Sequence, residues 1–175
     1  MLAVMTVCTG NICRSPMAEI VLRERLVAAG LSEDRVRVSS TGVSDEERGN
    51  RIDKRARAVL SEANYTDKAL DHHRAKQVRA SDLEEHDLIL AMTATHARAL
   101  RRLAPDSAVA SRVLLYRSFD PDAPEVAPGD PGEDRLDIVD PWYGDKQDFV
   151  HCLAQIEAAA DGIVEYLRNR LDNGH

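Results

Sequence analysis

The first eight residues constrain the fold more than any other part of this sequence. Leu2 to Cys8 is a continuous, largely apolar run, LAVMTVC, typical of a strand buried on both faces of a parallel sheet. A short turn interrupts it, and apolar residues then recur at helical spacing from Met17 to Leu26. Ser15 is placed to cap this helix and Gly30 to end it. The start of the chain therefore predicts a strand, a tight loop and a helix.

The rest of the chain alternates between the same two kinds of element. Further strands are expected at Arg35–Ser40, His86–Met92 and Arg112–Tyr116, and further helices at Asp53–Glu62, Thr93–Leu103 and Phe149–Leu171. The Asp-, Pro- and Gly-rich segment 119–140 predicts a long loop, and long loops are often functional. We therefore expect one α/β domain over residues 1–175, with three layers and a four-stranded, mostly parallel sheet covered by helices on both faces.

Charge and cysteine content limit the partners and the cellular location that can be expected for this protein. Thirty acidic against 23 basic residues give a net charge of −7, and no Lys/Arg run stands out, which argues against nucleic acid or an anionic membrane. No apolar stretch has the length of a signal peptide or a membrane span. The three cysteines, Cys8, Cys13 and Cys152, are too few and odd in number for a disulfide framework. We expect a cytoplasmic protein.

The loop from Cys8 to Ser15 carries the chemistry. Between a strand and a helix, its backbone N–H groups can converge on a tetrahedral oxyanion, and Gly10 and Asn11 tolerate the left-handed backbone that this requires. Arg14 offers a planar fork for phosphate oxygens. Cys8, at the strand end in this positive potential, is expected to be a nucleophilic thiolate, and the Ser15 hydroxyl can donate to its sulfur. A cysteine and an arginine at this spacing form a weak pattern alone; the surrounding strand and helix make it specific.

The stretch VCTGNICRSPMAE resembles the low-molecular-weight protein tyrosine phosphatase family. Four further segments match family motifs in the same order: Ser40-Thr41-Gly42, Asp53-Lys54-Arg55, His73-Arg74-Ala75-Lys76-Gln77 and Asp140-Pro141-Trp142-Tyr143-Gly144. The resemblance covers nearly the whole chain. It implies the fold of that family and hydrolysis of phosphotyrosine and aryl phosphate monoesters through a phosphocysteine on Cys8, without a cofactor or metal.

The resemblance also assigns residue roles. Asp140 is expected to be the general acid and base, a task that suits a carboxylate on a loop far from the nucleophile. Trp142 and Tyr143 would line the pocket for an aromatic leaving group. The expected phosphate-binding and loop-supporting residues are Thr9, Gly10, Asn11, Ile12, Cys13, Ser15, Ser40 and His73. The other carboxylates of the acidic loop, Asp122, Asp130, Asp134 and Asp137, are interpreted as solvated.

The chain contains two cysteines besides the nucleophile Cys8. By resemblance, Cys13 is the neighbouring cysteine that can form a reversible disulfide with Cys8, although a packed thiol without consequence is also compatible with the residues. Cys152 is expected to be buried in the last helix.

One position departs from the family pattern. Counted without gaps from Ser40, Glu46 falls where many members carry an aromatic residue that forms the second wall of the pocket. A carboxylate there would repel a dianionic phosphate and offer no stacking surface. We therefore hypothesise weaker phosphotyrosine binding, or a preference for substrates with positive charge near the phosphate.

Three other functions compete with tyrosine phosphatase. Arginine phosphatases resemble this family but prefer Thr at the position of Ile12. Arsenate reductases share the loop but need a further pair of closely spaced cysteines, which this chain lacks. A phosphoprotein-binding module without catalysis would require a defect that Cys8, Arg14 and Asp140 do not show. We expect a phosphotyrosine-containing protein as substrate and a monomer or weak dimer.

Overall fold

Strand β1 (Leu2–Cys8) lies at the centre of a four-stranded sheet in the computed structural model, which describes residues 1–174. The other strands are β2 (Val36–Gly42), β3 (Leu88–Ala91) and β4 (Val113–Leu115), in the order β2-β1-β3-β4. All neighbouring strands pair in parallel. The four-stranded sheet predicted from the sequence is confirmed; the bounds of β1 agree, and those of the other strands differ by one or two residues.

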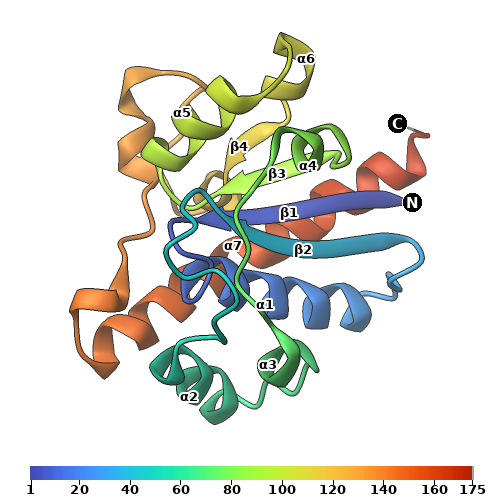
Figure 1. Cartoon of the computed structure of the whole chain (residues 1–175). Helices are drawn as coiled ribbons and strands as arrows, with labels where there is room; N and C mark the ends of the chain where they lie inside the picture. Colours follow the sequence, from blue (N-terminus) through green and yellow to red (C-terminus); the bar gives the residue numbers. More distant parts are fainter. Residues whose placement is uncertain (175) are drawn as a thin grey trace.

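Helices cover both faces of the sheet (Figure 1). One face packs against α1 (Arg14–Ala28), α7 (Lys146–Asp172), α2 (Lys54–Glu62) and α3 (Ala69–His72). The other lies under α4 (Ala80–Glu84), α5 (Ala94–Leu103) and α6 (Ser107–Ala110). Along β1, Leu2 and Val4 enter the first core, whereas Met5 and Val7 enter the second. Because side chains alternate along a strand, burial on both faces explains the apolar run of β1.

The predicted N-cap of the first helix is wrong. Helix α1 begins at Arg14, so Cys13 occupies the N-cap position without a side-chain cap, and Ser15 lies inside the first turn. The Ser15 hydroxyl points instead to the Cys8 sulfur, 3.0 Å away. At the other end the prediction holds: Gly30 has φ +76°, and Leu31 N donates to Leu26 O (2.9 Å) to close the helix.

Other helix starts follow their capping residues. Asp53 caps α2 and Thr93 caps α5, and each is the residue where the helix was expected to begin. Helix α7 begins earlier than the expected Phe149, because Asp145 and Asp148 form a reciprocal capping box before the first apolar residue. No helix among residues 1–174 is long and apolar enough to cross a membrane.

The acidic segment before Asp140 is anchored to the sheet. It contains the short 3₁₀ helices η1 (Tyr116–Phe119, at its start) and η2 (Pro131–Leu136). Asp137 is half-buried and accepts a hydrogen bond from Ala94 N (2.7 Å) at the start of α5, so the prediction that it is solvated is wrong. Ile138 N donates to Met92 O (2.9 Å), directly after β3. These bonds bring the end of the loop to the carboxyl edge of the sheet.

Candidate active site

The site is a loop between β1 and α1 at the carboxyl edge of the sheet. Cys8 is the last residue of β1 and Arg14 the first of α1. Asn11 has φ +60°, the left-handed conformation expected of it. The end of β2 lies directly against this loop, because a Cβ atom on Gly42 would be 2.5 Å from Thr9 O. Strand, loop and helix therefore form one closely packed unit.

Asn11 supports the loop with every polar atom of its side chain. Its Nδ2 donates to Ser15 Oγ (2.9 Å) and Ser40 Oγ (3.0 Å), and its Oδ1 accepts from Lys76 N (3.0 Å). The Asn11 carbonyl lies 2.7 Å from His73 Nε2. Burial lowers the pKa of His73, so the neutral ring donates its Nε2 proton to that carbonyl. The predicted support residues thus converge on one backbone turn.

Glu19 completes this support, and the sequence reasoning missed it. Ser40 Oγ donates to Glu19 Oε2 (2.5 Å), and Glu19 also pairs with Arg23 (2.8 Å). Glu19 is buried on the inner side of α1. A charged residue inside the apolar stripe of that helix was the available signal, because carboxylates are rarely buried without partners.

The Cys8 sulfur is held next to a hydroxyl. Cys8 Sγ and Ser15 Oγ are 3.0 Å apart and both residues are buried. Ser15 Oγ also lies 3.1 Å from Thr41 O, to which it can donate. The hydroxyl thus has two acceptors for one proton, and can turn it to the sulfur when the sulfur carries charge.

Arg14 is buried and held in a fixed orientation. Nη1 donates to Ile138 O (3.0 Å) and Nη2 to Thr9 Oγ1 (3.4 Å), while Nη2 also lies 3.3 Å from Asp140 Oδ2. The third guanidinium nitrogen, Nε, is buried and has no hydrogen-bond partner within residues 1–174. Buried N–H groups are rarely left unpaired, so this donor is suited to a ligand oxygen.

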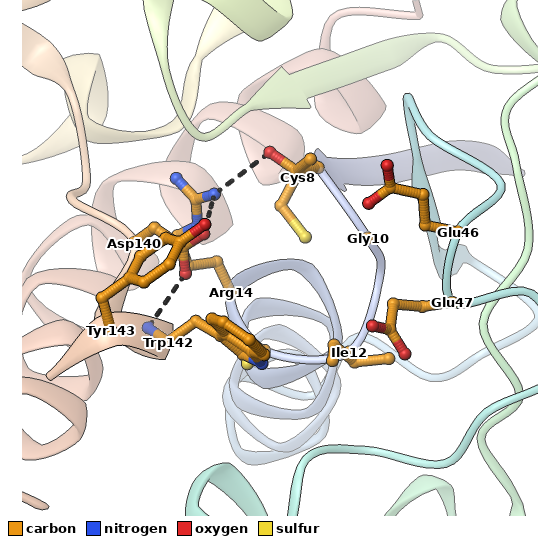
Figure 2. Close-up of a pocket in the computed structure, with 11 residues that line it drawn as sticks. Cys8, Gly10, Ile12, Arg14, Glu46, Glu47, Asp140, Trp142 and Tyr143 are labelled. Carbon is orange, nitrogen blue, oxygen red and sulfur yellow. Dashed lines mark hydrogen bonds and ion pairs between the residues drawn. The ribbon is translucent and has the colours of Figure 1, made fainter. Parts of the chain in front are cut away.

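Asp140 lies on the opposite side of the pocket from the loop residues near Glu46 (Figure 2). Its Oδ1 accepts from Trp142 N (3.1 Å) at the start of η3 (Pro141–Tyr143). Trp142 and Tyr143 are 44% and 87% exposed and pack edge to face at 5.0 Å. Such exposed aromatic rings beside an anion site offer a stacking surface for an aryl group.

Arg55 links this aromatic wall to α2, a contact that sequence reasoning did not find. Its Nη1 donates to Trp142 O (3.0 Å), and its guanidinium pairs with Asp53 (3.0 Å) and lies over the Phe149 ring (4.6 Å). Asp53 N in turn donates to Ile12 O (2.9 Å) in the phosphate loop. The two sides of the pocket are therefore joined through the start of α2.

Two carboxylates form the facing wall (Figure 2). Glu46 lines the pocket, as predicted, and is exposed. Glu47 also lines it, which was not predicted; its Oε2 accepts from Asn50 Nδ2 (2.6 Å). Glu47 Cγ would lie 3.0 Å from a Cβ atom on Gly10, so the glycine leaves room for this side chain. The pocket thus has an aromatic wall and an acidic wall.

The remaining cysteines are free and buried. Burial, reinforced by the Asp53 carboxylate, raises the pKa of the Cys13 thiol. Burial likewise raises the pKa of Cys152, in α7, to about 12. Both thiols are therefore neutral at physiological pH. The disulfide between Cys8 and Cys13 stays a prediction.

A cysteine at a strand end, with an arginine beside it and an aspartate across the pocket, defines the class of cysteine-dependent phosphatases. Sequence comparison shows to which family of these phosphatases the chain belongs. Residues 3–173 match the family model described as low molecular weight phosphotyrosine protein phosphatase, and the chain belongs to this family. The family, the fold and the enzyme class predicted from the sequence, a phosphoric monoester hydrolase of the protein-tyrosine-phosphatase type, are confirmed.

Similar proteins extend over nearly the full chain. The chain is 44% identical over 166 residues to a low molecular weight protein-tyrosine-phosphatase of Streptomyces coelicolor, covering 95% of this chain and 93% of the relative. It is 43% identical to low molecular weight protein-tyrosine phosphatase A of Mycobacterium tuberculosis, covering 94% and 91%. Among solved structures, a low molecular weight phosphotyrosine phosphatase of Vibrio cholerae superposes with a TM-score of 0.80 at 28% identity, covering 97% and 99%.

Proposed function

We propose that this chain hydrolyses phosphotyrosine in proteins with Cys8 as nucleophile, Arg14 as phosphate ligand and Asp140 as general acid and base. The observation that carries this proposal is their convergence: all three line one pocket, and the wall beside Asp140 is aromatic. An aryl phosphate fits such a pocket with its ring against Trp142 and its phosphoryl group in the loop.

The reaction proceeds in two steps. The Cys8 thiolate attacks phosphorus, so that an S–P bond forms as the bond to the tyrosyl oxygen breaks, and Asp140 gives its proton to that oxygen. Water then attacks phosphorus and loses a proton to the Asp140 carboxylate, while the S–P bond breaks and the thiolate returns. Backbone N–H groups of the loop and Arg14 stabilise the charge on the equatorial oxygens in both steps.

The substrate is a phosphoprotein, because an open pocket with exposed aromatic residues accepts a side chain that projects from a surface. We place the reaction in the cytoplasm, since all three cysteines are free thiols. We propose that the protein acts as a monomer or weak dimer.

The acidic wall makes this phosphatase prefer substrates with positive charge near the phosphotyrosine. Glu46 and Glu47 face the aromatic wall, and no salt bridge within residues 1–174 neutralises either of them. Their charges disfavour a peptide with acidic residues around the phosphotyrosine and favour one with Lys or Arg.

Hydrolysis of p-nitrophenyl phosphate by the wild type and by Cys8→Ser tests the proposal. Turnover by the wild type and its loss in Cys8→Ser are expected; no turnover by the wild type would leave the chain a phosphoprotein-binding module. A phosphotyrosine peptide and the matching phosphoarginine peptide separate the two related activities. Faster hydrolysis of phosphoarginine would overturn the substrate assignment.

A further inference from the structure

His96 lies behind the phosphate loop, and nothing in the sequence reasoning gave it a role. It belongs to the first turn of α5, where its backbone N–H donates to the capping hydroxyl of Thr93 (3.2 Å). Its side chain is 4% exposed, and its Nε2 lies 2.8 Å from Thr9 Oγ1. Helix α5 packs against the opposite face of the sheet from α1, so this bond connects the second core to the loop.

The surroundings of His96 decide which ring nitrogen carries the proton. Burial lowers the pKa of His96 to about 3, so the ring is neutral and holds one N–H. Within residues 1–174, its Nδ1 is buried and makes no hydrogen bond. A proton on Nδ1 would leave a buried N–H without an acceptor, which is rare in proteins. The proton therefore sits on Nε2, and His96 donates to Thr9.

Thr9 then has two donors pointing at its hydroxyl oxygen. Arg14 Nη2 lies 3.4 Å from the same Oγ1 atom that accepts from His96. A hydroxyl oxygen accepts two hydrogen bonds, so both acceptor positions are used and only its own proton stays free. Thr9 is exposed and lines the pocket, so that proton is available to a ligand oxygen.

We propose that His96 is a positioning residue of the phosphatase site: by donating to Thr9, it orients the Arg14 guanidinium and directs the Thr9 hydroxyl proton to a phosphoryl oxygen. This inference rests on the proposed function of the loop as a phosphate cradle. His96 touches neither the phosphate nor the nucleophile in this role. It acts only through Thr9, and this makes its effect separable from a packing effect.

The test compares four variants of the full chain: His96→Leu, His96→Gln, Thr9→Val and the double variant His96→Leu/Thr9→Val. Leucine fills the space without a donor, whereas the glutamine amide can place an N–H near the position of Nε2. The affinity for inorganic phosphate is measured by calorimetry, kcat and KM with p-nitrophenyl phosphate, and folding by thermal unfolding.

We expect His96→Leu to weaken phosphate binding about tenfold, the typical effect of losing a hydrogen bond that orients a charged group. The phosphate affinity of His96→Gln should lie within about threefold of that of the wild type, which in free energy is less than half of the effect expected for His96→Leu. In the Thr9→Val background, His96→Leu should cause no further loss, because its only route to the phosphate is gone.

Equal losses from His96→Leu in both backgrounds, or the same loss in His96→Gln as in His96→Leu, would overturn the positioning role. A lowered Tm with unchanged phosphate affinity would show that His96 is only a packing residue. Calorimetry measures phosphate affinity without turnover, so it tests the role of His96 independently of catalysis. A wild type that binds phosphate without turning over aryl phosphate would contradict the proposed function while the His96 comparison still stands.

Discussion

Arg14 Nη2 and Asp140 Oδ2 lie 3.3 Å apart, so the proposed phosphate ligand also holds the proposed general acid. The arginine side chain is almost fully buried and the aspartate is 37% exposed. A phosphoryl oxygen is a competing anion for the same guanidinium. We expect a bound phosphoryl oxygen to take the place of Asp140 as partner of Arg14, which would leave Asp140 available to the leaving oxygen. By this ion pair, we expect substrate binding to be coupled to the position of the acid.

Asp140→Asn is expected to separate chemistry from binding. Without a proton donor, kcat on a phosphotyrosine peptide should fall by about 100-fold or more, in the usual range for general acid catalysis. The loss should be smaller with p-nitrophenyl phosphate, because p-nitrophenolate leaves without protonation. Phosphate affinity, measured by calorimetry, should not weaken, since Arg14 no longer has a carboxylate partner. Equal losses on both substrates would contradict the assignment of Asp140 as the acid.

Glu46→Trp should replace an acidic wall by a stacking surface. For a phosphotyrosine peptide with neutral flanking residues, kcat/KM should rise about fivefold, the gain expected from one aromatic pair of about 1 kcal/mol. Glu46→Gln is the matched control, since it removes the charge without adding a ring. Both variants should show a weaker preference for peptides with flanking lysines, because only Glu47 then carries charge on this wall. An unchanged kcat/KM in Glu46→Trp would show that this wall does not contact the substrate.

Gly42→Ala should disturb the loop between Cys8 and Ser15, because the end of β2 packs against it. The added methyl group would lie 2.5 Å from Thr9 O and 3.0 Å from Asn11 N, and both are backbone atoms that cannot rotate away. We expect about 1–3 kcal/mol lower stability, typical of overpacking, together with weaker phosphate binding. Ser61→Ala on the exposed face of α2 is the control and should change stability by less than about 0.5 kcal/mol. A Gly42→Ala protein as stable as this control would contradict the close packing of β2 on the loop.

Stability should fall as the pH is lowered from 7.5 to 5.5. The pKa of His96 is about 3 in the folded protein against about 6.5 unfolded, so over this range only the unfolded chain takes up the proton. A depressed histidine pKa therefore stabilises the fold above pH 6.5 relative to lower pH, and His96 alone should account for about 1.4 kcal/mol of the loss. The lowered pKa of His73 acts in the same direction.

Urea unfolding at the two pH values measures this loss, and His96→Gln should reduce it by about 1.4 kcal/mol because glutamine does not titrate. An identical pH dependence in the wild type and the variant would show that His96 is not buried as a neutral ring.

The local sequence was sufficient to predict those parts of the fold and the site that depend on neighbouring residues. The unit from Leu2 to Gly30 was predicted almost completely, because burial on both faces, the left-handed Asn11 and the glycine helix end are properties of neighbouring residues. The same holds for the helices expected to start at Asp53 and Thr93, where each of these residues forms the cap. Asp140, Trp142 and Tyr143 were found only through motif resemblance, since the chain alone shows no reason for them to lie near Cys8.

Contacts between distant elements could not be read from the sequence. The bonds of Arg55 to Trp142 and of His96 to Thr9 depend on how strands and helices pack. Glu47 shows the same limit: its place in the pocket follows from the turn after β2.

The sequence by itself determined the nucleophile loop, the parallel sheet that presents it and the family to which the chain belongs. The tertiary structure decided which groups act on that loop. Strand and loop propensities act over a few neighbouring residues, whereas a hydrogen bond such as that between His96 and Thr9 exists only after α5 has packed on the sheet. The identity of Cys8 is therefore a local property, and the setting in which it reacts is a property of the whole fold.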